Sequence, residues 1–430
     1  MTPHFSAAFL RDGYHRKCLL SLFSEISHFD IGLPLRHFYV LVNNLRRLIT
    51  LLKEPNCTIY LYKTLNTPGE LIDSKHYHTI SREQFLGIVK TFGRGSLAQR
   101  IKYDVAVYKL SYTTNFLNKI ILCSGLVYLP IAKEAVPLMS FHHGTTFRKS
   151  EAPSVVDGFS GLEFFASVGS VCFRPDYIGY GDSEDSFHPY YDQESSANCV
   201  KDFIVAGLKF LTEQKTAHTN QLILAGYSEG GYITLATQKH LEASPIPGLK
   251  LAAVAAGAGG YDLKGMLSTL STGTSHIYPA YVAFLITSYE KVYNWNKPLD
   301  YYFNKSYAIQ LPELLNGSHD SIYINSRLTG DLSKLFNPKF YNNLKGSGEL
   351  EFKKALVMNS LINWSPQAPL RLYHGTNDEI IPYVNSETTL SSLKDNKQIE
   401  LIPIRGGNHI NSLVPMLESF IAWLGKLKIL

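Results

Sequence analysis

Neither sign of charge dominates this sequence, and its charged residues form no cluster. The 430 residues include 41 Lys and Arg against 36 Asp and Glu, a formal net charge of +5. The basic residues are scattered, which argues against a nucleic-acid-binding protein because such proteins gather Lys and Arg where they meet phosphate. No run of about 18 apolar residues occurs, so no transmembrane segment is predicted.

Cysteine is also sparse, and the five cysteines are widely spaced. At most two disulfides could form, and no spacing such as C-x-x-C indicates a metal site. Two of the five lie in apolar runs, which favours buried free thiols. The sequence therefore predicts no metal. The cysteines are Cys18, Cys57, Cys123, Cys172 and Cys199.

The first 65 residues lack a clean hydrophobic pattern, and we interpret them as an extension of unknown structure. A short apolar stretch at 18–23 follows several basic residues, but Glu25 soon interrupts it. No clear cleavage site follows, so the stretch makes a poor signal peptide.

Hydrophobic periodicity indicates strands and helices from about residue 80 onward. Ser81, with Gln84 three residues later, resembles the capping box that opens a helix. Two strands of antiparallel appearance lead into strand–helix repeats, which predicts an α/β fold with a mostly parallel central sheet and helices on both faces. The expected strands are 104–113, 120–129, 136–141, 170–174, 221–225, 251–256, 370–373 and 399–404. The expected helices after the first are 158–168, 194–211, 230–241, 383–393 and 412–424.

The alternation is interrupted once, at 263–366, where a Tyr-rich stretch contains nothing that resembles a core strand. We expect this stretch to be a helical cap inserted over one end of the sheet. The core would then comprise 66–262 and 367–430. No internal repeat or low-complexity segment is present.

Ser228 is the predicted nucleophile. It is the centre of Gly-Tyr-Ser-Glu-Gly at 226–230, a G-x-S-x-G motif between an expected strand and an expected helix. In that context the serine occupies a strained turn that presents its hydroxyl, and larger residues two before and two after it would collide. The N–H groups of the following helix favour developing negative charge nearby.

A serine hydroxyl needs a base, and in this fold the acid and then the base follow the nucleophile along the chain. Asp378 comes after the next-to-last expected strand, with Glu379 as the neighbouring alternative acid. His409 comes after the last strand, in a glycine-containing loop. These positions predict a Ser228, Asp378 and His409 triad, in which the acid fixes the tautomer of the imidazole.

An acyl-transfer intermediate also needs two N–H donors for its oxyanion. One predicted donor is the backbone N–H of Glu229, directly after the nucleophile. The other is the N–H of Thr145, with Gly144 as the alternative, in the loop after the third expected strand. We expect the side chain of His143 to pack and hydrogen-bond beneath this loop rather than to bind a metal.

Together these residues resemble the α/β-hydrolase superfamily, and more closely its secretory lipase (lipase A-like) family, over roughly residues 66–425. The resemblance implies a carboxyl-ester hydrolase that has a helical cap over its acyl site, needs no cofactor, and acts outside the cytoplasm on a small ester or lipid, which it could meet at a lipid interface. The motifs that carry it are His143-Gly144-Thr145, the segment 175–183, His188-Pro189-Tyr190, Gly226 to Gly231, His374 to Asp378 and Gly407-Asn408-His409.

Other polar residues receive structural interpretations. The carboxylates of 176–183 belong to a glycine-rich loop that would shape the wall of the site, and His188 is interpreted in the same way. His76 and His78 precede the expected core and should be exposed.

An esterase or lipase that works through an acyl-enzyme is the function this pattern predicts. A serine peptidase of the prolyl or dipeptidyl type shares the triad but would need a large N-terminal module, and a non-catalytic binding protein would not need all three triad residues. A narrow dry pocket would favour acyl chains and a wide polar one aryl or sugar esters. Aromatic residues of the insertion are candidates for facing the acyl chain, although most should pack within it: Tyr281, Phe284, Tyr289, Tyr293, Trp295, Tyr301, Tyr302 and Phe303.

Overall fold

The computed structural model describes residues 67–91, 95–156, 158–272, 278–393 and 398–430. The predicted N-terminal extension at 1–65, with Cys18 and Cys57, lies outside these residues. Cys123, Cys172 and Cys199 are buried free thiols, as predicted for the first two.

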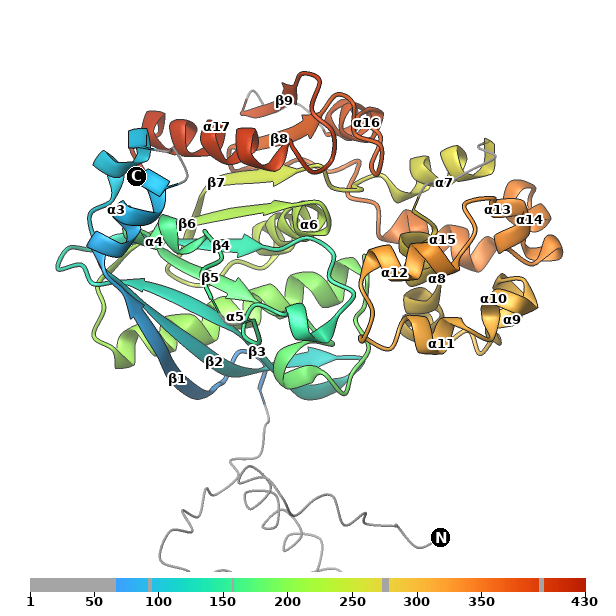
Figure 1. The fold of residues 1–430 in the computed structure, drawn as a ribbon, viewed down its shortest axis with the longest axis horizontal. Coiled ribbons are helices and arrows are strands. Elements are labelled where there is room, and N and C mark those ends of the chain that lie inside the picture. Colours follow the sequence, from blue (N-terminus) through green and yellow to red (C-terminus); the bar gives the residue numbers. More distant parts are fainter. Residues whose placement is uncertain (1–66, 92–94, 157, 273–277, 394–397) are drawn as a thin grey trace, which may run out of the picture. The chain divides into compact units, whose positions relative to one another are not determined.

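The described residues form a sheet of nine strands in the order β1-β2-β3-β5-β4-β6-β7-β8-β9 (Figure 1). Strand β3 pairs antiparallel with β2 and β5, and every pair from β5–β4 to β8–β9 is parallel. The predicted mostly parallel sheet is therefore confirmed. Its strands are β1 (Leu71–Ile80), β2 (Val105–Phe116), β3 (Lys119–Pro130), β4 (Val136–His142), β5 (Val171–Pro175), β6 (His218–Tyr227), β7 (Lys250–Gly257), β8 (Leu370–Gly375) and β9 (Ile399–Ile404).

Strand β1 is an addition to the predicted sheet. It pairs antiparallel with β2 at the sheet edge, and nearly all of its residues are exposed. An edge strand without a buried face carries little hydrophobic alternation, which explains why the sequence pattern does not reveal it. His76 and His78 are exposed as expected, but they belong to the sheet.

Helices cover both faces of the sheet. The buried side chains of α5 and α6 share one hydrophobic core with one face, and those of α3, α4 and α17 share a second core with the other. Helix α4 is shorter than the predicted 158–168, whereas the others lie close to their predicted ranges. The helices of the sheet layers and the neighbouring α16 are α3 (Arg82–Thr91), α4 (Glu163–Ser167), α5 (Gln193–Glu213), α6 (Glu229–Ala243), α16 (Val384–Ser392) and α17 (Leu413–Lys426). Short 3-10 helices are η4 (Gly95–Arg100), η5 (Lys149–Glu151) and η6 (Gly181–Ser183).

Local sequence signals account for two helix starts. At α3 the N–H of Ser81 donates to Gln84 Oε1 at 2.7 Å, and the N–H of Gln84 donates to Ser81 Oγ at 3.2 Å. This is the predicted capping box. At α5 the side chain of Asp192 accepts a hydrogen bond from the N–H of Ser195, which is the usual role of an N-cap aspartate.

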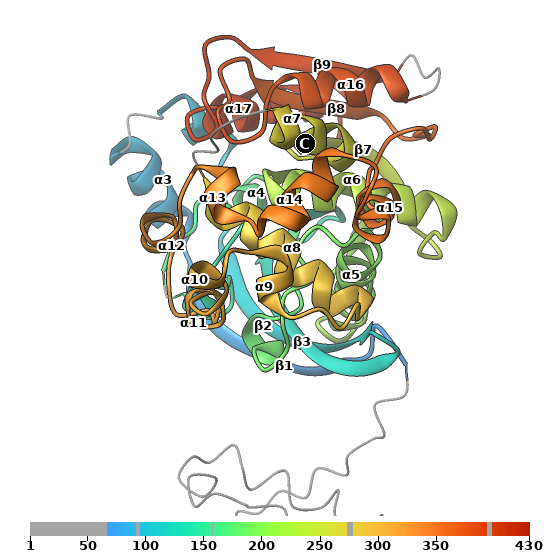
Figure 2. The same cartoon turned by 90° about the vertical axis from the view of Figure 1, so that its right-hand side faces the viewer.

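The segment between β7 and β8 is helical in its described parts, apart from one isolated bridge between Phe303 and Phe336. Its helices gather beyond the ends of the parallel strands (Figure 1) and lie in front of the sheet when that end faces the viewer (Figure 2). They are α7 (Leu263–Thr272), α8 (Pro279–Tyr293), α9 (Leu299–Tyr302), α10 (Lys305–Ala308), α11 (Leu311–Leu314), α12 (Ser321–Arg327), α13 (Leu332–Leu335), α14 (Pro338–Lys345) and α15 (Leu350–Met358).

Gly207 of α5 provides a test of how closely this helix packs on the sheet. A Cβ atom there would lie 2.3 Å from Cε1 of the fully buried Phe173. We expect Gly207→Ala to lower the free energy of unfolding by about 1–3 kcal/mol through overpacking. Gly87→Ala in α3 is the matched control, because no atom lies within 4 Å of its added Cβ; it should stabilise by about 0.5–1 kcal/mol. Urea unfolding measures both, and equal effects at the two sites would contradict the close packing.

His142, at the end of β4, should make stability sensitive to acid. Its ring nitrogens lie 3.0 Å from Ser140 Oγ and 2.7 Å from Thr234 Oγ1. Burial, aided by His143, lowers the pKa of His142 to about 3 from 6.5. Since the unfolded chain binds the proton more tightly, the stabilisation is fully present above about pH 6.5 and is lost as the pH falls toward 3.

Between pH 7.5 and pH 5.5 the unfolding free energy of the parent protein should fall. In His142→Gln we expect this fall to be about 1.4 kcal/mol smaller. Urea unfolding of both proteins at the two pH values measures this difference. An equal loss in the variant and the parent protein would mean that His142 is not held neutral in the folded state.

Candidate active site

Ser228 occupies a sharp turn between β6 and α6. Its backbone has φ 60° and ψ −125°, a conformation that costs energy for a non-glycine residue and clusters at functional sites. The N–H of Ser228 donates to the carbonyl of Gly257 on the neighbouring strand β7 at 2.8 Å. The turn is therefore held to the sheet while the serine side chain stays partly exposed.

The glycines of the motif are a steric requirement. A Cβ on Gly226 would lie 2.2 Å from the carbonyl oxygen of Gly230, so the positions two before and two after the serine do collide as predicted. A Cβ on Gly230 would lie 2.0 Å from the carbonyl oxygen of His142. Strands β6 and β4 and helix α6 can approach this closely only because both positions lack a side chain.

His409 links the other two residues of the predicted triad. Its Nε2 lies 2.9 Å from Ser228 Oγ, and its Nδ1 lies 2.6 Å from Asp378 Oδ2. A carboxylate only accepts, so Nδ1 carries the proton and Nε2 presents its lone pair to the serine hydroxyl. The structure therefore brings together three residues that are up to 181 positions apart.

Asp378 is surrounded by donors that favour its ionised form. Its Oδ1 accepts the N–H groups of Ile380 and Ile381, each at 2.9 Å. Burial alone would raise the pKa of Asp378, but hydrogen bonds from His374 and His409 outweigh it and hold this pKa well below its usual range. The contact with buried His374, at 3.3 Å, is one that the sequence did not indicate.

The alternative acid, Glu379, has a different partner. Its Oε2 accepts the backbone N–H of His409 at 3.4 Å, whereas the imidazole contacts Asp378. The hydroxyl of Tyr227, next to Ser228, donates to the carbonyl of His409 at 2.6 Å. The loop that carries the histidine is thus held from both sides.

The loop after β4 lies against Ser228. A Cβ on Gly144 would be 3.5 Å from Ser228 Cβ. The N–H of Thr145 makes no hydrogen bond to any residue that the structure describes, and its Oγ1 lies 2.9 Å from the hydroxyl of Tyr190. Glu229 is the first residue of α6, where backbone N–H groups lack partners within the helix.

His143 lies beneath this loop, in the role preferred from the sequence. Its ring stacks on Tyr177 with centroids 4.1 Å apart, and Nδ1 lies 2.8 Å from the carbonyl oxygen of Gly144. Burial, with the nearby charge of Arg174, lowers the pKa of His143 to about 3, so the ring is neutral. The adjacent Asp176 is fully buried and its carboxylate accepts from Ser124 and Ser154, which agrees with a structural role.

A buried pair that the sequence did not indicate lies directly beside Ser228. The Glu229 carboxyl, 1 % exposed, has its Oε1 2.6 Å from Nε2 of His188. The only sequence signal for this pair is the acidic residue within the motif, since a buried carboxyl group requires a partner.

Ser228 opens into a cavity of about 80 Å³ between the core and the helical segment. Apart from Ser228 and tyrosine hydroxyls, its lining is apolar. Of the aromatic candidates in the insertion only Tyr281 lines it, and Phe336 and Phe352 were not anticipated. The lining comprises Tyr190, Tyr191, Ser228, Leu263, Met266, Leu267, Tyr281, Val282, Leu285, Ile286, Phe336, Leu344, Phe352, Leu356, Ile380 and Ile381.

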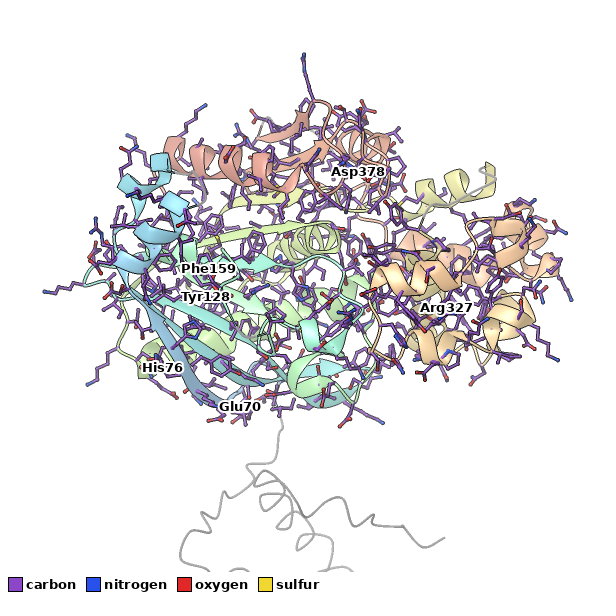
Figure 3. The ribbon with its side chains drawn as sticks, in the orientation of Figure 1. Glu70, His76, Tyr128, Phe159, Arg327 and Asp378 are labelled. Atoms are coloured by element: carbon purple, nitrogen blue, oxygen red, sulfur yellow. The ribbon has the colours of Figure 1, made fainter. Side chains whose placement is uncertain are left out.

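The described residues offer neither a metal site nor a membrane-spanning helix. Within the described ranges, no group of three or more His, Cys, Asp or Glu side chains is arranged to hold a metal ion, and no helix there has the length and apolarity to span a membrane. His76 lies on β1, well away from Asp378 (Figure 3).

Known proteins resemble this chain in both sequence pattern and fold. A candidate hydrolase from Legionella pneumophila is 26% identical, with a TM-score of 0.76, over 84% of this chain and 98% of its own. The rice cell wall degrading esterase LipA from Xanthomonas oryzae is 24% identical, with a TM-score of 0.73 over the same shares. Candida antarctica lipase A in its closed state is 16% identical, with a TM-score of 0.64, over 87% of this chain and 86% of its own.

No curated protein matches the chain. The model of the secretory lipase family, however, matches residues 166–427, more than half of the sequence, and this range includes Ser228, Asp378 and His409. With the α/β-hydrolase sheet described above, this match shows that the chain belongs to the secretory lipase family.

Proposed function

We propose that this protein is a serine carboxyl-ester hydrolase that acts through an acyl-enzyme on Ser228. The observation that carries the proposal is the position of His409, 2.9 Å from Ser228 Oγ and 2.6 Å from Asp378 Oδ2. These distances allow one imidazole to accept the serine proton while the carboxylate stabilises the imidazolium. Membership of the secretory lipase family supports the choice of esters as substrates.

The reaction follows from these contacts. His409 Nε2 takes the proton of Ser228 as Oγ attacks the ester carbonyl. The resulting oxyanion accepts hydrogen bonds from the backbone N–H groups of Glu229 and Thr145. His409 then gives the proton to the leaving alcohol as the ester C–O bond breaks, which leaves an acyl group on Ser228. Water, activated by the same imidazole, attacks this acyl-enzyme and releases the carboxylic acid. Asp378 remains ionised throughout.

The helical segment 263–366 is proposed to be a cap domain over a core made of 66–262 and 367–430. Its helices supply most of the apolar lining around Ser228, so it would hold the acyl part of the substrate. Among the residues that the structure describes, no Asp, Glu, Lys or Arg side chain lines this cavity. A dipeptidyl peptidase would need such a group for the charged amine of its substrate, so the lining favours an ester.

The size of the cavity suggests the length of the acyl chain. Its volume is about 80 Å³, and one water molecule takes up about 30 Å³ in the liquid. About three groups of that size therefore fit. Since a methylene group is about as large as a water, we propose a short acyl chain of about four carbons, counting the carbonyl carbon.

Replacement of Ser228 tests the proposed nucleophile. We expect Ser228→Ala to lower kcat on a nitrophenyl butyrate by at least about 10⁴-fold, because the acyl-enzyme can no longer form. The parent protein should react with a fluorophosphonate and the variant should not. Ser326→Ala, at an exposed position of α12, is the matched control and should retain both properties. Equal turnover by Ser228→Ala would rule out the proposal.

A series of nitrophenyl esters from two to sixteen carbons tests the acyl site. We expect kcat/KM to be highest at about four carbons. Met266→Trp, which fills the cavity beside Ser228, should shift this maximum to shorter chains. Met358→Trp at an exposed site on α15 is the control. A maximum at sixteen carbons, or the same shift in both variants, would contradict the assignment of this cavity to the acyl chain.

A further inference from the structure

The segment His188-Pro189-Tyr190 lies in the loop between η6 and α5, and neither the triad nor the acyl cavity explains its polar contacts. We propose that this segment supports both oxyanion donors through their side chains: Tyr190 restrains Thr145, and His188 balances the charge of Glu229. The inference rests on the proposed function, because it concerns the intermediate formed on Ser228. His188 and Tyr190 are therefore positioning residues, which act through the two donors.

The first contact is between His188 and Glu229, whose N–H is one proposed donor. Nδ1 of His188 lies 2.8 Å from the carbonyl oxygen of Ile178, which can only accept, so Nδ1 carries a proton. Nε2 lies 2.6 Å from the Glu229 carboxyl. Two lone pairs would repel at that distance, so one further proton lies between these atoms. The pair as a whole is therefore neutral.

Neutrality matters because this pair is buried beside the place where negative charge develops. His188 and Glu229 are 7 % and 1 % exposed. Their ionisable neighbours include His143, whose pKa burial lowers, and a set of phenols whose pKa values burial raises, so these neighbours stay neutral. These tyrosines are Tyr177, Tyr180, Tyr190, Tyr191 and Tyr281. A negative charge on Glu229 that is not balanced by the His188 proton would oppose the oxyanion.

The second contact is between Tyr190 and Thr145, the other proposed donor. The Tyr190 hydroxyl lies 2.9 Å from Thr145 Oγ1. Thr145 lies in a loop outside the described strands and helices, so this bond restrains a residue that no ladder of backbone hydrogen bonds fixes. Tyr190 also lines the cavity that contains Ser228, which places the contact beside the reacting atoms.

Helix α8 supports the segment from the other side. Ser288 Oγ donates to the carbonyl of His188 at 3.1 Å, and the ring of Phe284 stacks on Tyr190 with centroids 4.7 Å apart. One short segment, fixed against α8, thus contacts the side chains of both residues whose N–H groups face the oxyanion. Such positioning acts on the transition state, so its loss should lower kcat and leave KM almost unchanged.

A double-mutant cycle tests the contact between Tyr190 and Thr145. We expect Tyr190→Phe and Thr145→Val each to lower kcat on a nitrophenyl butyrate about 3- to 10-fold, with KM changed less than about twofold. The double variant should be no slower than the slower single variant, because both changes remove the same bond. Tyr112→Phe is the matched control, since it removes a fully buried hydroxyl bonded to the carbonyl of Cys199.

A rescue experiment tests the charge balance of the pair formed by His188 and Glu229. In His188→Gln the amide still donates to Glu229 but supplies no positive charge, so kcat should fall about 10- to 100-fold. Adding Glu229→Gln removes the uncompensated charge and should raise kcat at least about threefold above that of His188→Gln alone. A merely structural role predicts that the second substitution adds damage. Glu163→Gln, at another buried carboxyl, should not rescue His188→Gln.

The outcomes separate this inference from the proposed function. All rates are divided by the fraction of molecules that a fluorophosphonate labels, so misfolded protein does not count. If the parent protein neither turns over esters nor becomes labelled, the proposed function and the inference are both wrong. If the parent is active, two results overturn the inference and leave the proposed function standing. One is that Tyr190→Phe and Thr145→Val have kcat values within twofold of the parent. The other is that their losses multiply in the double variant. A lack of rescue by Glu229→Gln also overturns the inference. If His188→Gln does not fold, the double-mutant cycle on Tyr190 and Thr145 tests the inference instead.

Discussion

The backbone of Ser228 imposes the constraint on which the rest of the site depends. A positive φ at a serine persists only where the surroundings prevent relaxation, and here the bond to Gly257 and the contacts of Gly226 and Gly230 do so. Because these glycines let β4, β6 and α6 meet without side chains between them, Ser228, the end of β4 and the start of α6 are fixed relative to one another. The parallel sheet then brings the loops after β8 and β9, with Asp378 and His409, to the same edge.

The sequence was sufficient to predict those features that depend on local chemistry. Periodicity and short-range hydrogen bonds predict the capping box at Ser81, the buried face of α5 and most strands of the sheet. The structure confirms all three. Strand β1 is the exception, since its burial pattern carries no signal. The proposed triad could be predicted because G-x-S-x-G and the order of strands indicate where an acid and a base would follow. The structure brings Ser228, Asp378 and His409 within hydrogen-bond distance.

Features that depend on contacts between distant loops were not predictable in the same way. The cavity lining combines residues of α7, α8, α14 and α15 with the loop after β8, and no spacing in the sequence indicates that Phe336 and Phe352, rather than the neighbouring aromatic residues, face Ser228. His374 was noted as part of a motif, but its approach to Asp378 depends on how the chain turns at Ile381, whose carbonyl it also contacts.

Glu229 nevertheless shows that chemistry can narrow such a search. The residue after a nucleophilic serine is fixed by the turn, so its side chain cannot leave the core, and a lone carboxylate there would oppose the oxyanion that its own N–H is proposed to bind. An acidic residue at this position is therefore neutral only if a proton is held on it or on a partner within hydrogen-bond distance. His188, 41 positions away, meets that requirement, and its ring is oriented by the carbonyl of Ile178. The demand for neutrality beside a developing charge thus connects a residue of the motif to a segment that sequence patterns alone describe only as structural.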